Sequence, residues 1–149
     1  MQSEQTEGAG APACDPNLQK PRRVLYIEDN SPNMALVEQI FAEQTSLELM
    51  TATEGQIGLD LARQHAPDLI LLDLHLPDIP GWEVIEQLKA DHTTREVPVI
   101  VVSADATVPQ IKRLLSAGAH SYLTKPFDIA EFFRSIDEAL AAPETAKAG

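Results

Sequence analysis

Short apolar runs alternate with segments of helical periodicity along most of the chain. Continuous apolar runs of four to six residues are typical of strands covered on both faces of a sheet. The pattern predicts five strands, at 24–27, 47–52, 69–72, 97–102 and around 122–123. Because a helical pattern separates each strand from the next, we expect right-handed βαβ units and a parallel sheet with helices on both faces.

Five helices are predicted between and after these strands. Ser31 and Pro32 supply an N-cap and a first-turn proline for the first helix, whose apolar positions recur at helical spacing from Met34 to Phe41. Gly118 is suited to the left-handed position that ends a helix. The remaining helices are expected at 55–65, 82–90, 108–116 and 129–140. The last one should bury a stripe made of Ile129, Phe133, Ile136 and Leu140.

The two ends of the chain have a different composition. Residues 1–21 and 142–149 contain mainly Gln, Glu, Gly, Ala, Pro and other small or polar residues. Such segments bury too little apolar surface to offset the entropy of ordering. We therefore predict a disordered N-terminal tail, one folded domain at 22–141 and a disordered C-terminal tail.

Composition excludes several classes of partner. The chain has 149 residues and a net charge of −12, so it offers little positive charge to nucleic-acid phosphates or anionic lipid. Its single cysteine, Cys14, cannot form an internal disulfide. No apolar segment resembles a signal peptide or a membrane span. These features predict a cytoplasmic protein that binds neither nucleic acid nor membrane.

Chemically active side chains follow the predicted strands. Glu28 and Asp29 end the first strand, Asp73 the third, Ser103 the fourth and Lys125 the fifth. In an open parallel sheet the strand C-termini share one edge, where ligands bind. Carboxylates that converge there can hold a hard divalent cation.

In this order, the residues resemble the CheY-like receiver domains of bacterial two-component response regulators, over about residues 22–140. Each motif by itself is weak, but together and in sequence they are specific. The resemblance rests on Glu28-Asp29, Asp73, Leu76-Pro77, Gly81, Ser103 and Lys125-Pro126.

The resemblance implies a flavodoxin-like (βα)5 fold, a doubly wound parallel sheet with strand order 2-1-3-4-5. It implies that Asp73 accepts a phosphoryl group from a histidine kinase or a histidine phosphotransfer protein. Mg²⁺ (or Mn²⁺) would be bound by Asp29, Asp73 and the backbone carbonyl of His75, with Glu28 acting through water. Lys125 would contact a phosphoryl oxygen, and a cis peptide is expected before Pro126.

Ser103 and Tyr122 form the predicted switch. If Ser103 moves toward the phosphoryl group, the Tyr122 ring can turn inward and change the face made by the fourth helix, fifth strand and fifth helix. The alternative is that Tyr122 keeps one rotamer. His75 and Asp105 should flank the pocket mouth and tune loss of the phosphoryl group; the alternative is that both are solvated polar side chains.

Three hypotheses about aromatic and histidine positions complete the expected site. Trp82 is interpreted as a packing residue at a helix start. One of Phe132 and Phe133 should face the core, and an outward Phe132 would suit a partner surface. None of the histidines lies in a context that resembles a kinase phosphoacceptor helix, so the phosphoryl donor should be another protein.

With no output domain expected after 141, the signal would pass by protein–protein contact or onward phosphotransfer. One alternative is a receiver-like binding module that works without phosphorylation. Another is an aspartyl-phosphate hydrolase of the haloacid-dehalogenase type, which needs a second acid where this chain has His75. The sequence leaves open the kinase, the target, the phosphoryl lifetime, a phosphorylation-dependent homodimer, and whether this receiver is free-standing or part of a hybrid kinase.

Overall fold

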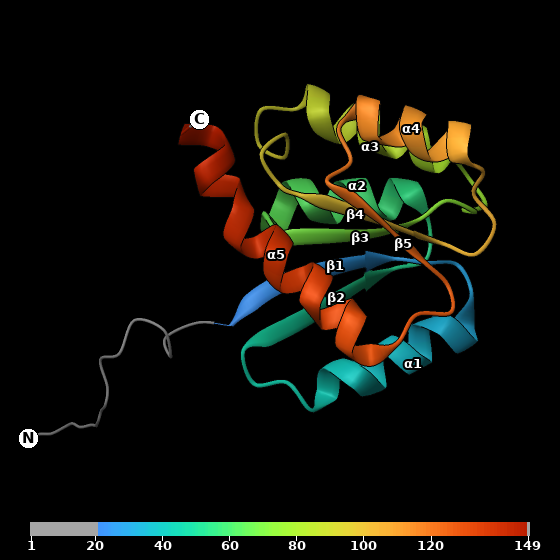
Figure 1. Cartoon of the computed structure of the whole chain (residues 1–149), viewed down its shortest axis with the longest axis vertical. Coiled ribbons are helices and arrows are strands. Elements are labelled where there is room, and N and C mark those ends of the chain that lie inside the picture. Colours follow the sequence, from blue (N-terminus) through green and yellow to red (C-terminus); the bar gives the residue numbers. More distant parts are fainter. Residues whose placement is uncertain (1–20, 149) are drawn as a thin grey trace, which may run out of the picture.

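Five parallel strands form one sheet in the order β2-β1-β3-β4-β5 (Figure 1). The structure is a computed structural model that describes residues 21–148, with side chains described as far as residue 141. The predicted strand order is confirmed. The strands are β1 Arg22–Ile27, β2 Leu47–Ala52, β3 Leu69–Asp73, β4 Val99–Ser103 and β5 Ser121–Thr124.

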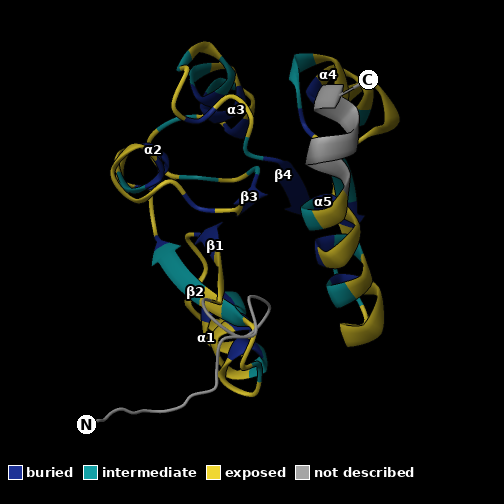
Figure 2. Cartoon of the chain, turned by 90° about the vertical axis from the view of Figure 1, so that its left-hand side faces the viewer, coloured by how far each residue is buried: buried dark blue, intermediate teal, exposed yellow. Residues whose placement is uncertain are grey.

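Helices cover both faces of this sheet. Buried side chains of α2, α3 and α4 pack together on one face, and those of α1 and α5 pack on the other. The two central strands β3 and β4 are buried along their whole length, as Figure 2 shows. The helices are α1 Ser31–Ala42, α2 Gly55–His65, α3 Gly81–Ala90, α4 Val108–Ala117 and α5 Ile129–Ala148.

The ends of α1 and α4 show why the chain turns where it does. Asn30, not Ser31, is the N-cap of α1, since its side chain accepts a 2.9 Å hydrogen bond from the backbone N–H of Asn33. The prediction of a Ser31 N-cap was therefore wrong by one residue; Asn is an equally good cap and comes first in the chain. Pro32 lies in the first turn, as predicted. Gly118 ends α4 with a φ of 124°, a region that favours glycine.

The N-terminus of α2 is capped from a distant part of the chain. The cap residue Glu54 makes no side-chain capping bond. Instead, Asp78 in the loop after β3 accepts hydrogen bonds from the N–H groups of Gly55 and Gln56, both at 2.8 Å. This carboxylate satisfies two orphan donors and opposes the positive end of the helix dipole. It also fixes the loop after β3 against α2.

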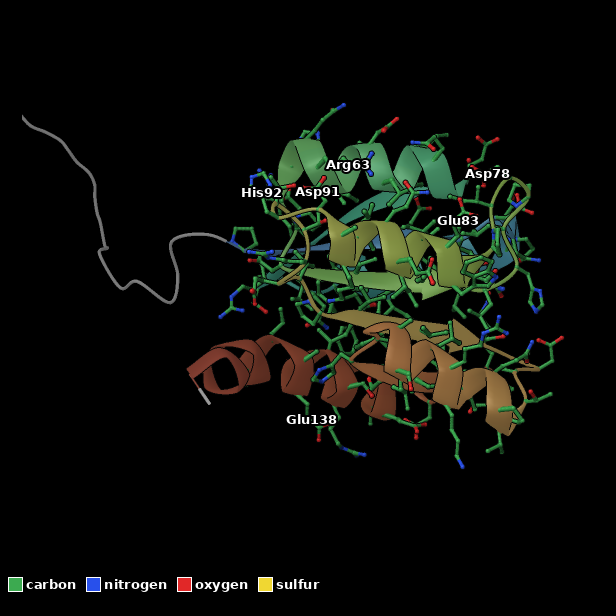
Figure 3. All side chains as sticks on the ribbon, turned by 90° about the horizontal axis from the view of Figure 1, so that it is seen from above. Arg63, Asp78, Glu83, Asp91, His92 and Glu138 are labelled. Carbon is green, nitrogen blue, oxygen red and sulfur yellow. The ribbon has the colours of Figure 1, made fainter. Side chains whose placement is uncertain are left out.

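A second contact holds α2 to α3 at their other ends. Arg63 of α2 lies 3.1 Å from Asp91, which follows the last residue of α3, as Figure 3 shows. Asp91 in turn accepts hydrogen bonds from the backbone and hydroxyl of Thr93. The two helices are thus tied at both ends.

Helix α5 is longer than predicted. It runs to Ala148, so the prediction that it ends at residue 140 was wrong. The boundary predicted at 141, between the folded domain and a C-terminal tail, stays a prediction. Ala, Glu and Lys dominate this segment and are strong helix formers, which can prolong a helix that is already nucleated. Residues 1–20 and 149 lie outside the described residues, so most of the predicted N-terminal tail is not covered.

The buried face of α5 also differs from the prediction. Phe132 is 1% exposed and Ile129 is 56% exposed, so Phe132 faces the core and Ile129 does not. The Phe132 ring stacks on Phe127, with centroids 4.7 Å apart, and meets Phe41 of α1 edge-on. These aromatic contacts decide the rotation of the helix, and an outward Phe132 is excluded. No described helix is long and apolar enough to cross a membrane.

Candidate functional site

The predicted site residues gather where the parallel strands end. Glu28 follows β1, Asp73 ends β3, Ser103 ends β4 and Lys125 follows β5. Glu28, Asp73 and Ser103 are buried, and Lys125 is largely so. The four side chains lie at one edge of the sheet because the strands are parallel and in register there.

Glu28 is the most fully coordinated acid of the site. Its Oε1 accepts hydrogen bonds from Lys125 Nζ and from the Tyr26 hydroxyl, both at 2.7 Å, and its Oε2 accepts one from the Asn30 N–H at 3.2 Å. Burial alone would raise the pKa of Glu28, but the bonds from Lys125, Tyr26 and Asn30 outweigh it and lower that pKa. Glu28 is therefore an ionised carboxylate in a buried position.

Asp73 has less compensation for its charge. It is 5% exposed, and Lys125 Nζ lies 3.5 Å from its Oδ1. Burial and the negative charge of Glu28 raise the pKa of Asp73 to about 6, although Lys125 acts in the opposite direction. Lys125 is shared between Asp73 and Glu28. One ammonium group cannot neutralise two carboxylates, so a bound cation would be favoured here.

Asp29 lies apart from this pair. It is exposed and lines an open groove together with His75 and the loop that follows. Among the side chains described, those of residues 21–141, no three from His, Cys, Asp or Glu come close enough to hold a metal by themselves. The three predicted carboxylates thus converge only in part: Glu28 and Asp73 are together, and Asp29 stands at the rim, because its side chain points to solvent where the chain turns into α1.

The donor set nevertheless fits a magnesium ion. Mg²⁺ keeps several waters and needs only one or two carboxylates from a protein, so a compact cage of three acids is not required. Asp73 is a buried carboxylate whose charge is only partly balanced by Lys125, and Asp29 and the His75 carbonyl are hard oxygen donors beside an open, polar groove. This fit rests on the chemistry of the residues present.

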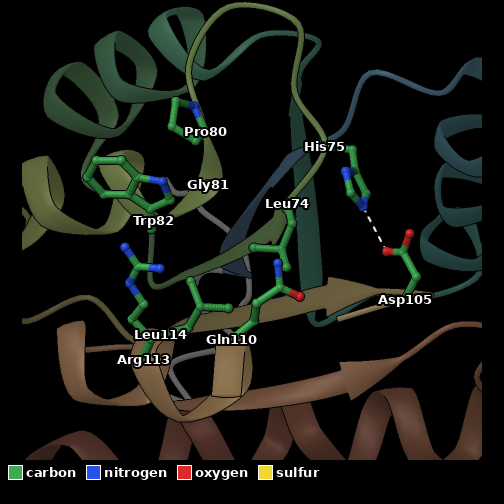
Figure 4. A pocket seen from close by; sticks show the side chains of 9 residues that line it. All are labelled: Leu74, His75, Pro80, Gly81, Trp82, Asp105, Gln110, Arg113 and Leu114. Carbon is green, nitrogen blue, oxygen red and sulfur yellow. Dashed lines mark hydrogen bonds and ion pairs between the residues drawn. The ribbon is translucent and has the colours of Figure 1, made fainter. Parts of the chain in front are cut away.

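A polar bridge crosses the mouth of the site. His75 Nε2 lies 2.7 Å from Asp105 Oδ1, a contact that Figure 4 marks with a dashed line. The Ser103 hydroxyl donates to the same Asp105 oxygen at 3.3 Å. The hydrogen bond to Asp105 raises the pKa of His75 and lowers the pKa of Asp105. The loops after β3 and β4 are thereby joined, and Ser103 is attached to the bridge.

Tyr122 is held by its hydroxyl. The half-buried ring packs against the core, and its O–H donates to the backbone carbonyl of Ser103 at 2.9 Å. A displacement of Ser103 would therefore act directly on the phenol. The peptide bond between Lys125 and Pro126 is cis, as predicted.

Two features of the site were missed by the sequence reasoning. Tyr26 was treated as part of an apolar strand, yet its hydroxyl contacts Glu28. The signal was available, because residues two apart in a strand share a face and Glu28 follows Tyr26 by two. Trp82 lies at the start of α3, is 40% exposed and lines a cavity of about 340 Å³ with Arg113 and His75, which the sequence did not indicate (Figure 4).

Comparison with known proteins decides the family. The family model described as the response regulator receiver domain matches residues 24–137. The chain belongs to the response regulator receiver domain family. It is 39% identical over 116 residues to the polar-differentiation response regulator DivK of Brucella anthropi, a match that covers 78% of this chain and 94% of that protein.

Solved receiver structures agree with this assignment. A CheY-like receiver domain protein from Methanospirillum hungatei superimposes with a TM-score of 0.77 at 27% identity, covering 85% of this chain and 99% of that one. The receiver domain of the sensor histidine kinase PA1611 from Pseudomonas aeruginosa gives 0.74 at 28% identity, covering 80% and 98%. That structure is described with a magnesium ion coordinated in the active-site cleft.

Membership has direct consequences for function. This receiver domain is part of two-component signalling, in which receivers interact with histidine kinases or phosphotransfer proteins. Receiver domains act as signalling switches and in general not as true enzymes, and the family binds Mg²⁺ at its active site.

Proposed function

We propose that Asp73 is the phosphoacceptor of this receiver, and that it takes its phosphoryl group from a phosphohistidine on a kinase or phosphotransfer protein. The observation that carries the proposal is the Asp73 carboxylate, buried at the ends of the strands with Lys125 Nζ 3.5 Å away. In the transfer, an Asp73 oxygen bonds to phosphorus as the phosphorus–nitrogen bond to the donor histidine breaks. The product is an acyl phosphate on Asp73.

Asp29, Asp73 and the His75 carbonyl would hold Mg²⁺ (or Mn²⁺), and Glu28 would act through a bound water. The bound cation would neutralise the negative charge that gathers between the carboxylates and the phosphoryl oxygens. Lys125 is placed to give a second positive charge to a phosphoryl oxygen. Its position between Glu28 and Asp73 supports this role.

The switch would begin at Ser103. Its hydroxyl can exchange the bond to Asp105 for one to the new phosphoryl group, and the movement would be passed to Tyr122 through the Ser103 carbonyl. The face made by α4, β5 and α5 would then change its affinity for a protein target. His75 and Asp105 would set the lifetime of the acyl phosphate by shielding it from water.

Incubation with Mg²⁺ and acetyl phosphate tests the proposal. Intact mass spectra of the wild-type protein and Asp73→Asn are compared, and we expect a gain of one phosphoryl group in the wild type alone. Equal gains in both proteins would move the acceptor elsewhere. No gain in either, with Mg²⁺ binding shown by calorimetry, would favour a binding module independent of phosphorylation, and turnover of a phosphomonoester would favour a hydrolase.

A further inference from the structure

A buried tyrosine hydroxyl at the end of β1 is bonded to the site but has no role in the phosphoryl transfer proposed above. The chain has two tyrosines, and Tyr26 is the one that is 1% exposed. Burying a tyrosine hydroxyl lowers the stability of the folded protein unless that hydroxyl makes a hydrogen bond. The Tyr26 hydroxyl donates to Glu28 Oε1 at 2.7 Å, so a strand position that would suit phenylalanine carries one additional polar atom aimed at the site.

The acceptor of this bond is also the anchor of Lys125. Glu28 Oε1 receives both the Tyr26 hydroxyl and Lys125 Nζ, each at 2.7 Å, whereas Nζ is 3.5 Å from Asp73 Oδ1. Lys125 is therefore bonded more closely to Glu28 than to Asp73. To reach a phosphoryl oxygen on Asp73, the ammonium group has to loosen its bond to Glu28.

That movement leaves Glu28 with fewer donors. Glu28 is 1% exposed, and a buried carboxylate that loses a charged donor is strongly destabilised. The Tyr26 hydroxyl stays on the same oxygen and limits this loss. Asn30 bonds to the other oxygen and cannot replace Lys125 there.

We propose that Tyr26 is a positioning residue that holds the Glu28 carboxylate and so allows Lys125 to move from Glu28 to the phosphoryl group. The proposal rests on the phosphoacceptor function proposed for Asp73. Without the hydroxyl, Glu28 would depend more on Lys125 and retain it. The ring of Tyr26 also lines a cavity of about 330 Å³ beside Lys125, but that contact would survive the loss of the hydroxyl.

Tyr26→Phe removes the hydroxyl and keeps the ring. At saturating Mg²⁺ and with acetyl phosphate as donor, we expect its phosphorylation rate constant to fall about tenfold, the size of one charge-assisted hydrogen bond. Its dissociation constant for Mg²⁺, measured by calorimetry, should change by less than about threefold, since the two predicted carboxylate ligands are untouched. A wild-type rate constant would overturn the proposal, as would equal losses in both quantities.

Thr94→Val is the matched control. Thr94 is also fully buried, and its hydroxyl donates to the Leu88 carbonyl at 2.7 Å at the C-terminal end of α3, away from the strand ends that form the site. Both variants should melt at lower temperature, but only Tyr26→Phe should slow phosphorylation. If Thr94→Val slows it to the same extent, general destabilisation explains the effect and the proposal fails.

A second measurement needs no phosphoryl transfer. Acetylation of Lys125 by limiting acetic anhydride, followed by peptide mass spectrometry, reports how firmly its amine is held. We expect Lys125 to react about threefold more slowly in Tyr26→Phe, and the difference to vanish in a Glu28→Gln background, because the effect acts through Glu28. Unchanged reactivity overturns the proposal whether or not wild type is phosphorylated. Reduced reactivity without phosphorylation would leave the link from Tyr26 through Glu28 to Lys125 in place and overturn the phosphoacceptor function instead, so the two failures are distinguishable.

Discussion

His75 and Asp105 join the loops that follow β3 and β4 across the mouth of the site, with 2.7 Å between Nε2 and Oδ1. Both side chains are otherwise mostly exposed, so the pair lies at the surface of the site. The contact is the basis for testing whether these residues tune loss of the phosphoryl group, which stays a prediction.

Opening this bridge should shorten the life of the acyl phosphate. In His75→Ala or Asp105→Ala we expect dephosphorylation to be roughly fivefold faster, the size of one lost hydrogen bond between exposed partners. Loss of phosphoryl mass over time, after the donor is removed, measures the rate. The double variant should be no faster than the single ones, and single variants that match wild type would rule out the tuning role.

Tyr122→Ala tests the switch. Phosphorylation of the wild-type protein should change backbone hydrogen exchange in 108–117 and 121–124, because Ser103 and Tyr122 are linked through the Ser103 carbonyl. We expect the variant to accept the phosphoryl group with little or no change in these segments. If the variant responds as wild type does, Tyr122 keeps one rotamer and the signal takes another route.

Asp78→Ala should destabilise the fold by about 1 kcal/mol through loss of the cap on α2. Urea unfolding at neutral pH measures the difference. Asp68→Ala is unsuitable as a control, because the Asp68 side chain also accepts a hydrogen bond from a backbone N–H, in this case that of Arg23. Asp60→Ala, on the exposed side of α2, is the better control and should cost little.

The same cap predicts a pH dependence. Burial is the largest single influence on Asp78 and opposes its ionisation, but the backbone hydrogen bonds, chiefly from Gln56 and Gly55, together outweigh it and lower the pKa of Asp78. A lowered folded-state pKa means that the stabilisation is complete above the ordinary aspartate value of about 3.9 and is lost as the pH falls through the folded pKa. The difference in the free energy of unfolding between wild type and Asp78→Ala should therefore be constant from pH 7 to about 5 and shrink toward pH 3. A difference at pH 3 as large as that at pH 7 would contradict the prediction.

Phe132→Ala should lower the free energy of unfolding by about 3–5 kcal/mol, since it leaves a cavity between Phe127 and Phe41. Ile129→Ala on the same helix should cost less than about 0.5 kcal/mol, because Ile129 is exposed. Chemical denaturation of the two variants compares the faces of α5 directly. Equal costs would mean that the helix is rotated toward the stripe first predicted from the sequence.

The apolar runs predicted the strands and a parallel sheet, and the resemblance to receiver domains supplied the strand order. Strand-length runs of Val, Ile and Leu have few alternatives, and the parallel order places Glu28, Asp73, Ser103 and Lys125 at one edge. The rotation of α5 was not predictable from spacing, since adjacent Phe132 and Phe133 fit a helical stripe equally well. Contact with Phe41 and Phe127, which are distant in sequence, selects Phe132.

Which side chains pair within the site could not be predicted from the sequence either. Residue types indicated a lysine near acids, but not that Lys125 would bond to Glu28 at 2.7 Å and remain 3.5 Å from Asp73. That preference depends on side-chain reach across the sheet edge. The position of Asp29 at the rim depends likewise on where α1 begins.

The bond from Asp78 to the start of α2 has a consequence for how the receiver meets its ligands. Asp78 lies three residues after His75, and Gly81, where the loop ends, approaches Leu74 so closely that an added Cβ would lie 2.8 Å from a Leu74 side-chain atom. The segment that offers the His75 carbonyl is therefore fixed at both ends once the chain has folded. Its conformational entropy is lost at folding and not when a cation or a phosphoryl donor arrives, so association there can be fast and need not wait for a loop to order.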